Sequence, residues 1–112
     1  MSRARYPHTP DGRYFVARNR LWRCTDPSLD EAQRQAWVSA LMAARRAIRD
    51  ARDDVSVRAA RQQVQKAKEA LGERGPVWWD DGAADETRRS PANSSYADWW
   101  ASLSAEERRA GG

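Results

Sequence analysis

The sequence holds little of the chemistry on which most enzymes and metal-binding domains depend. It has one cysteine, Cys24, and one histidine, His8, so it predicts neither an intramolecular disulfide nor a Cys/His zinc site. It also lacks a Walker loop, a G-x-G-x-x-G run and a G-x-S-x-G elbow. We therefore expect a protein that is not an enzyme and that uses no cofactor, no metal and no small-molecule substrate.

Long apolar runs are missing too. No segment approaches the roughly 20 apolar residues that a membrane-spanning helix needs. Pro7, Pro10 and Gly12 interrupt the first residues, so these do not form the apolar centre of a signal peptide. A single cysteine is typical of a reducing compartment. We expect a cytoplasmic protein that does not contact a membrane.

The few reactive side chains lie in settings that do not favour catalysis. His8 stands between two prolines on an expected arm, whereas a general base needs a fixed position and an orienting partner. Cys24 has no second cysteine or histidine beside it in a recognisable motif. The acidic residues of segment 80–86 lack the alternating spacing of a calcium loop. We interpret all of them as structural or solvated groups.

Charge is present in quantity but is unevenly distributed. The 112 residues carry a formal net charge of +4. Residues 1–23 hold six arginines and one carboxylate, whereas residues 75–112 hold four arginines and seven carboxylates. A basic body with an acidic tail can attract a polyanion or a second copy of itself.

The clearest pattern predicts two amphipathic helices between Leu29 and Leu71. Apolar residues recur every three or four positions over 29–51 and again over 57–71. Weak helix formers and capping residues at 52–56 separate the two stripes, which favours an antiparallel helical pair. The alternative is one unbroken helix, whose exposed stripe would require a partner helix and therefore a dimer.

The ends and the seam of this pair can also be predicted. Ser28 and Glu31 fit a capping box at the start of the first helix, and Gly72 fits the C′ position after the second. The expected seam consists of small residues, namely Ala32, Ala36, Ala40, Ala44, Ala60, Val64 and Ala67.

The segments on either side are shorter. Residues 13–24 alternate as a β-hairpin does, with Asn19 suited to a positive φ in the turn. An isolated hairpin is marginal in water, so we expect it to lie against the helices through Phe15, Leu21 and Trp22. After the helices come a Trp-containing loop, a polar stretch with Pro91 and a short helix that begins near Tyr96.

We therefore predict an α+β domain, mostly α, with an N-terminal β-hairpin packed on an antiparallel two-helix hairpin. A Trp-rich loop and a short C-terminal helix complete it. The predicted divisions are a flexible arm over 1–12, a core over 13–82, a polar linker over 83–95, and an aromatic helix with a frayed tail over 96–112.

Two Trp-Trp pairs carry the leading functional hypothesis. Neighbouring residues of an extended segment face opposite sides, so only one of Trp78 and Trp79 easily enters the core. Aromatic residues dominate binding hot spots, which favours an interaction module that binds a protein partner or a second copy of itself. The alternative is that the last helix folds back and closes the core. The predicted partner-binding residues are Trp78, Trp79, Tyr96, Trp99, Trp100 and Leu103.

Arginines carry a second hypothesis, nucleic-acid binding by the arm, the hairpin and one face of the first helix. Arginine suits phosphate geometry, and an exposed Tyr14 or Trp22 would add stacking on single strands. An i,i+4 pair of Arg49 with Asp53 would neutralise part of the helix face, and the alternative is a merely solvated basic surface. The predicted residues are Arg3, Arg5, Arg18, Arg20, Arg23, Arg45, Arg49 and Arg52.

Three blocks of sequence also resemble a group of short bacterial proteins. They are Arg13–Val16 with Arg20–Arg23, the helical stretch Leu41–Arg46, and the run Gly72–Trp79, which reads GERGPVWW. Some members of this group carry the label biopolymer transporter Tol. The resemblance spans roughly residues 6–103 and implies no particular activity, so it assigns no catalytic or binding residue.

Overall fold

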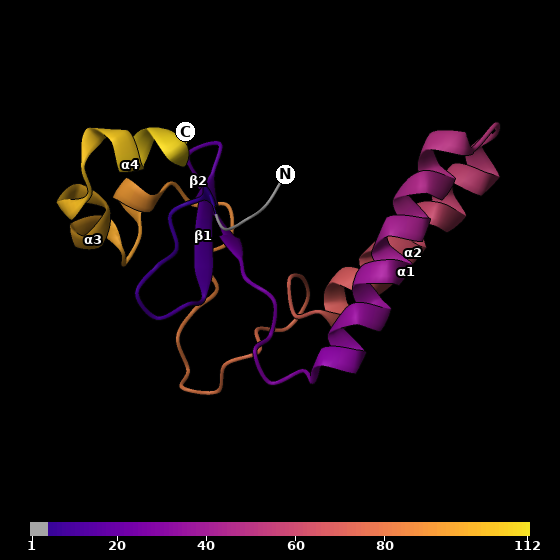
Figure 1. Cartoon of the computed structure of the whole chain (residues 1–112), viewed down its shortest axis with the longest axis horizontal. Coiled ribbons are helices and arrows are strands. Elements are labelled where there is room, and N and C mark those ends of the chain that lie inside the picture. Colours follow the sequence, from indigo (N-terminus) through magenta and orange to yellow (C-terminus); the bar gives the residue numbers. More distant parts are fainter. Residues whose placement is uncertain (1–4) are drawn as a thin grey trace. The chain divides into compact units, whose positions relative to one another are not determined.

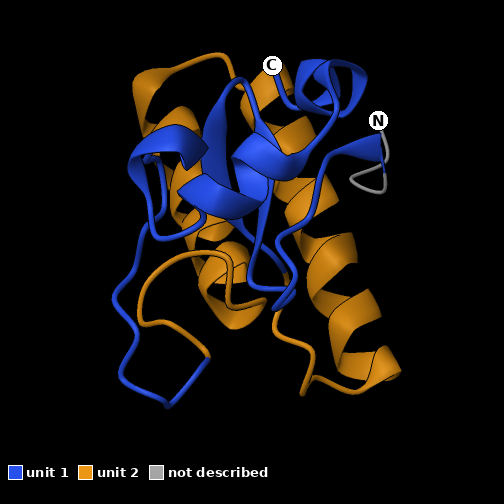
Figure 2. Cartoon of the chain, turned by 90° about the vertical axis from the view of Figure 1, so that its left-hand side faces the viewer, with its two compact units in different colours: residues 1–24, 79–112 blue, residues 25–78 orange. Residues whose placement is uncertain are grey.

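The computed structural model describes residues 5–112 and confirms an α+β chain that is mostly α (Figure 1). It divides into two compact units (Figure 2), which we name the hairpin unit (residues 1–24 and 79–112) and the helical unit (residues 25–78). The elements are β1 (Tyr14–Ala17), β2 (Arg20–Arg23), α1 (Glu31–Asp50), α2 (Asp54–Ala70), η2 (Pro91–Asn93), α3 (Ala97–Ser102) and α4 (Ala105–Ala110).

The helical unit contains the predicted antiparallel pair, α1 and α2 (Figure 1). The chain leaves the helical conformation at Ala51, which has a φ of −65° and a ψ of 140°. Asp53 then caps α2, because its carboxylate accepts a hydrogen bond from the backbone N–H of Ser56 at 2.7 Å. The alternative of one unbroken helix is therefore wrong.

The N-cap of α1 lies two residues later than predicted. Asp30, not Ser28, accepts a hydrogen bond from the N–H of Gln33 at 2.7 Å, and the side chain of Gln33 accepts one from the N–H of Asp30 at 3.2 Å. The hydroxyl of Ser28 instead donates to Asp26 at 2.8 Å. The sequence encodes two overlapping capping boxes, one starting at Ser28 and one at Asp30. The Ser28 hydroxyl is already hydrogen-bonded to Asp26, so the second box caps the helix.

The seam between the helices is also shifted from the prediction. Ala44, Ala60 and Ala67 are buried as expected, but Ala32, Ala36 and Ala40 are exposed. The contact face of α1 runs instead along larger residues, which bury more apolar area than alanine does. The apolar cluster comprises Leu41, Ala67 and Leu71, with Leu29, Trp37, Val38 and Val64 packed against it.

Gly72 ends α2 as predicted, with a φ of +81°. A Cβ atom at this position would lie 2.8 Å from Cδ1 of Trp78 and 2.9 Å from Cβ of Asp26. Both the conformation and the close approach of neighbouring residues therefore require glycine.

The hairpin unit is built on the antiparallel pair β1–β2, in which Tyr14 faces Arg23 and Val16 faces Leu21. The two turn residues, Arg18 and Asn19, have φ angles of 54° and 58°. Positive φ at both positions is the signature of a type I′ turn, whose twist matches that of the strands. The positive φ predicted for Asn19 is confirmed.

The arm and a distant segment cover the two edges of this hairpin. On the β1 edge, Val16 donates its N–H to the carbonyl of Pro7 at 2.9 Å. On the β2 edge, Leu21 donates to the carbonyl of Arg89 at 2.9 Å and accepts from the N–H of Arg88 at 2.7 Å. Residues 88 and 89, within the predicted polar linker 83–95, thus pair with β2.

The C-terminal tail, predicted to be frayed, forms the helix α4. Ser104 caps α4 by accepting from the N–H of Glu107 at 3.1 Å, and the carboxylate of Glu107 accepts from the N–H of Ser104 at 2.9 Å. The S-x-x-E pattern of this capping box was readable in the sequence. Beyond α4, the carbonyl of Gly111 accepts from the N–H of Asn19 at 2.8 Å.

The position of the α1 cap can be tested with two matched substitutions. Asp30→Ala removes the side chain that satisfies a free N–H and should lower the free energy of unfolding by about 1 kcal/mol. Ser28→Ala should change it by clearly less, because the Ser28 hydroxyl caps no helix. Urea unfolding followed by circular dichroism measures both, and a larger loss for Ser28→Ala would contradict the assignment.

Candidate functional site

The aromatic residues of the hairpin unit gather around Tyr14. Its ring lies 5.5 Å from the ring of Trp79 and 5.5 Å from that of Tyr96, edge-on in both cases. Tyr14 is buried, so it offers no stacking surface, contrary to prediction. Trp79 is 8% exposed and Trp78 is half-buried, which confirms that one member of this pair enters the core.

The second Trp-Trp pair is divided in the same way. Trp100 is 9% exposed, and a Cβ atom on Gly111 would lie 3.2 Å from Cη2 of Trp100 and 3.0 Å from Cγ1 of Val16. Trp99 is half-buried with its ring 6.0 Å from that of Trp100, and Leu103 is also half-buried. Trp79 and Trp100 are thus part of the core, whereas Trp99 and Leu103 remain partly exposed to solvent.

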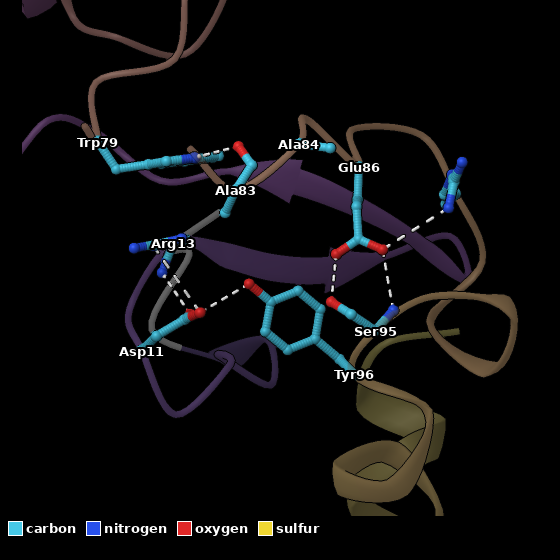
Figure 3. Close-up of a pocket in the computed structure, with 9 residues that line it drawn as sticks. Asp11, Arg13, Trp79, Ala83, Ala84, Glu86, Ser95 and Tyr96 are labelled. Atoms are coloured by element: carbon cyan, nitrogen blue, oxygen red, sulfur yellow. Dashed lines mark hydrogen bonds and ion pairs between the residues drawn. The ribbon is translucent and has the colours of Figure 1, made fainter. Parts of the chain in front are cut away.

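A cavity of about 340 Å³ lies beside this aromatic group, within the hairpin unit (Figure 3). Its wall is formed by Asp11 and Arg13, which precede β1, by the 79–95 segment, and by Tyr96, the residue before α3. The lining residues are Asp11, Arg13, Trp79, Ala83, Ala84, Glu86, Arg89, Ser95 and Tyr96.

Asp11 ties the arm to the start of α3 in this wall. Its carboxylate accepts hydrogen bonds from the hydroxyl of Tyr96 and the hydroxyl of Thr9, both at 2.7 Å, and from the N–H of Arg13 at 3.1 Å. Burial acts to raise the pKa of Asp11, but these hydrogen bonds together outweigh it and lower the pKa below 3.8. Burial and the same carboxylate raise the pKa of the Tyr96 hydroxyl.

The other charged groups of the cavity are paired as well. Arg13 lies over the ring of Trp79 at 4.8 Å and forms an ion pair with Asp81. The carboxylate of Glu86, whose side chain is 11% exposed, accepts hydrogen bonds from the N–H and hydroxyl of Ser95 and lies 3.7 Å from Arg89. These polar groups already satisfy one another, and their contacts link residues 11–13 to the 79–96 segment.

The predicted nucleic-acid-binding arginines fall into different environments. Arg23 is buried, and its Nε lies 3.9 Å from the carboxylate of Asp85, so it does not present its charge to a partner. Arg5 is exposed, and Arg3 lies outside the described residues.

Arg45 and Arg49 lie on α1 and are exposed. Arg52, predicted on the same helix face, is also exposed, but it lies in the connection between α1 and α2. Arg49 lies 3.6 Å from Asp50, and its predicted pairing with Asp53 is wrong because α1 ends at Asp50 and Asp53 caps α2. The neutralising partner is therefore a neighbouring residue in the chain.

Three exposed arginines lie at this end of the hairpin, and we name them the hairpin-end cluster: Arg18 in the turn, Arg20 at the start of β2, and Arg88, whose backbone pairs with Leu21. Arg20 donates from its guanidinium to the carbonyl of Arg88 at 2.9 Å. The hydrogen bond from Asn19 to Gly111 also brings the end of α4, which carries two further arginines, next to this turn (Figure 1). No ion pair to a carboxylate forms at the cluster within residues 5–112.

Sequence patterns could not find Arg88. Its place depends on backbone hydrogen bonds between its segment and Leu21, and these carry no residue signature. Arg88 also has a φ of 76°, and Arg18 one of 54°. Left-handed conformations cost an L-residue other than glycine or asparagine about 1–2 kcal/mol. The chain thus holds two arginines at positions where asparagine would be less strained.

Other kinds of site are not indicated. Within residues 5–112, His, Cys, Asp and Glu side chains form no group of three that could hold a metal ion. The helices described here are each too short or too polar to cross a membrane. No family model matches the chain, and neither the curated proteins nor the solved structures include a match. The resemblance drawn from the sequence stays a prediction.

Trp99 and Trp100 provide a matched test of the core. Trp100→Ala should lower the free energy of unfolding by about 3–5 kcal/mol, because it empties a buried position against Val16 and Gly111. Trp99→Ala should cost distinctly less, since that side chain is only half-buried. Urea unfolding of both variants decides, and equal losses would contradict the division of the pair.

The hydrogen bonds to the Asp11 carboxylate predict that the stability of the fold depends on pH. A carboxylate with a pKa below 3.8 in the fold stabilises it above that pH, and this contribution is lost as the pH falls further. The difference in unfolding free energy between wild type and Asp11→Asn should therefore be largest at neutral pH and shrink below pH 3.8. Urea titrations of both proteins at neutral pH and below pH 3.8 measure this difference in unfolding free energy. A difference that does not vary with pH would refute the role of the charge.

Proposed function

We propose that this protein is a non-enzymatic nucleic-acid-binding module that holds phosphates on the hairpin-end cluster. One observation carries the proposal: backbone pairing and the hydrogen bond from Arg20 to the carbonyl of Arg88 bring a distant segment to the hairpin end, where Arg18, Arg20 and Arg88 are all exposed and have no carboxylate partner among the described residues. Phosphate contacts by arginine supply most of the affinity of such proteins.

The backbone conformation supports this choice over a merely solvated surface. An arginine that serves only solubility has no reason to occupy a left-handed position, because asparagine keeps the turn at lower strain. Arg18 and Arg88 both occupy such positions. Strain that persists at an exposed charged residue is typical of binding sites.

A protein partner bound through aromatic residues is the second candidate. Burial removes Trp79 and Trp100 from the surface that this function would need. Trp99 and Leu103 remain half-buried on and just after α3, and they support a smaller anchor. Trp99→Ala with Leu103→Ala should then abolish capture of a partner while nucleic-acid binding stays unchanged.

The leading proposal is tested by removing the cluster in a way that suits the backbone. The triple variant Arg18→Asn, Arg20→Gln, Arg88→Asn should bind a labelled oligonucleotide more weakly at low salt. The slope of log K against log salt should fall by about 0.7–0.9 for each lost phosphate contact. The same variant should be at least as stable as wild type, because asparagine relieves two strained positions. Fluorescence anisotropy and urea unfolding give the two readouts.

A control with the same loss of charge separates the cluster from net charge. Arg45→Gln, Arg49→Gln, Arg52→Gln removes three exposed positive charges from the helical unit. This control should retain most of the affinity. Equal losses in both triple variants would contradict a site at the hairpin end, and absence of binding by the wild-type protein at low salt would refute the function.

A further inference from the structure

The face of the hairpin that points away from the Tyr14 core carries a row of aromatic rings. Tyr6 and His8, both on the arm, lie 5.7 Å and 6.0 Å from the ring of Phe15, measured between centroids. The register of the strands places Trp22 directly opposite Phe15. Side chains of directly paired residues share one face of a sheet, so the row extends from the arm across both strands.

Backbone hydrogen bonds hold this row in place. The arm is fastened by the bond from Val16 to the carbonyl of Pro7, and His8 forms a bridge with Phe15. The indole N–H of Trp22 donates to the carbonyl of Ala17 at 2.9 Å, which fixes the ring over the hairpin. The rings are thus positioned before any partner arrives, which reduces the entropy lost on binding.

Part of this row stays accessible. Phe15 is buried beneath its neighbours, whereas Tyr6 and Trp22 are half-buried and His8 is exposed. Trp22 and Arg20 lie two positions apart in β2, so their side chains leave the same face of the hairpin. An aromatic row therefore borders the hairpin-end cluster.

We infer that the partner of this face is a single-stranded nucleic acid, whose bases stack on Trp22, Tyr6 and His8 while its phosphates contact the cluster. The inference rests on the proposed function and adds the substrate class. Every base offers a face for stacking when it is unpaired, whereas a duplex hides those faces inside its own stack. Aromatic rings interleaved with arginines fit the first kind of partner.

The test compares one mixed-sequence oligonucleotide with its own duplex, both binding to the full chain at the same low salt. The single strand should bind at least tenfold more tightly. Trp22→Leu should weaken single-strand binding by roughly tenfold, as loss of one stacked base does, and leave duplex binding unchanged. Tyr6→Leu, on the arm, is a second variant for the case that Trp22→Leu fails to fold, and Trp22→Phe should retain most of the affinity.

Trp99→Leu is the control, because it removes a half-buried indole outside the row. Equal affinity for single strand and duplex, or full single-strand affinity in folded Trp22→Leu and Tyr6→Leu, would overturn the inference and leave the hairpin-end cluster as a phosphate site. Heparin binding as tightly as the single strand would do the same, since heparin has no bases. Absence of binding to every probe would instead refute the proposed function.

Discussion

The hairpin unit depends on the pairing of Leu21 with residues 88 and 89. A two-stranded hairpin leaves two open edges and is marginal by itself in water. Here Leu21 exchanges two backbone hydrogen bonds with the 88–89 segment, and the arm covers the edge of β1. This pairing orders a stretch rich in polar residues, sets Arg88 beside Arg20, and holds the 79–95 segment where Trp79 meets Tyr14. Folding and the candidate site therefore rest on the same few bonds.

Local signals predicted the local structure well. The helical pair, the glycine after α2 and the turn at Asn19 follow from periodicity and turn chemistry, which act within a few residues. The errors at α1 have the same origin, because two capping boxes overlap and the helix can start at either. The seam between the helices consists of larger side chains than predicted, because burying Leu41 stabilises the fold more than burying an alanine does.

The candidate site could be predicted only in part. Arg18 and Arg20 were found from composition, but Arg88 depends on pairing between segments about 67 residues apart, for which sequence carries no residue code. The sequence also did not show which hairpin side chains are buried. Arg23 and Tyr14 face the core, whereas Arg20 and Trp22 lie on the other face of the hairpin. A strand register fixes which residues reach a partner, and the turn at Arg18 and Asn19 fixes that register.

Amide hydrogen exchange at Arg88 tests the central claim most directly. The claim is that residues 88 and 89 are paired to β2 and that this pairing brings Arg88 to the cluster. The Arg88 N–H donates to Leu21 at 2.7 Å, so it should exchange as slowly as the N–H of Val16 inside the hairpin unit. Exchange of Arg88 at the rate of an unstructured linker, with Val16 protected, would contradict both the pairing and the site built on it.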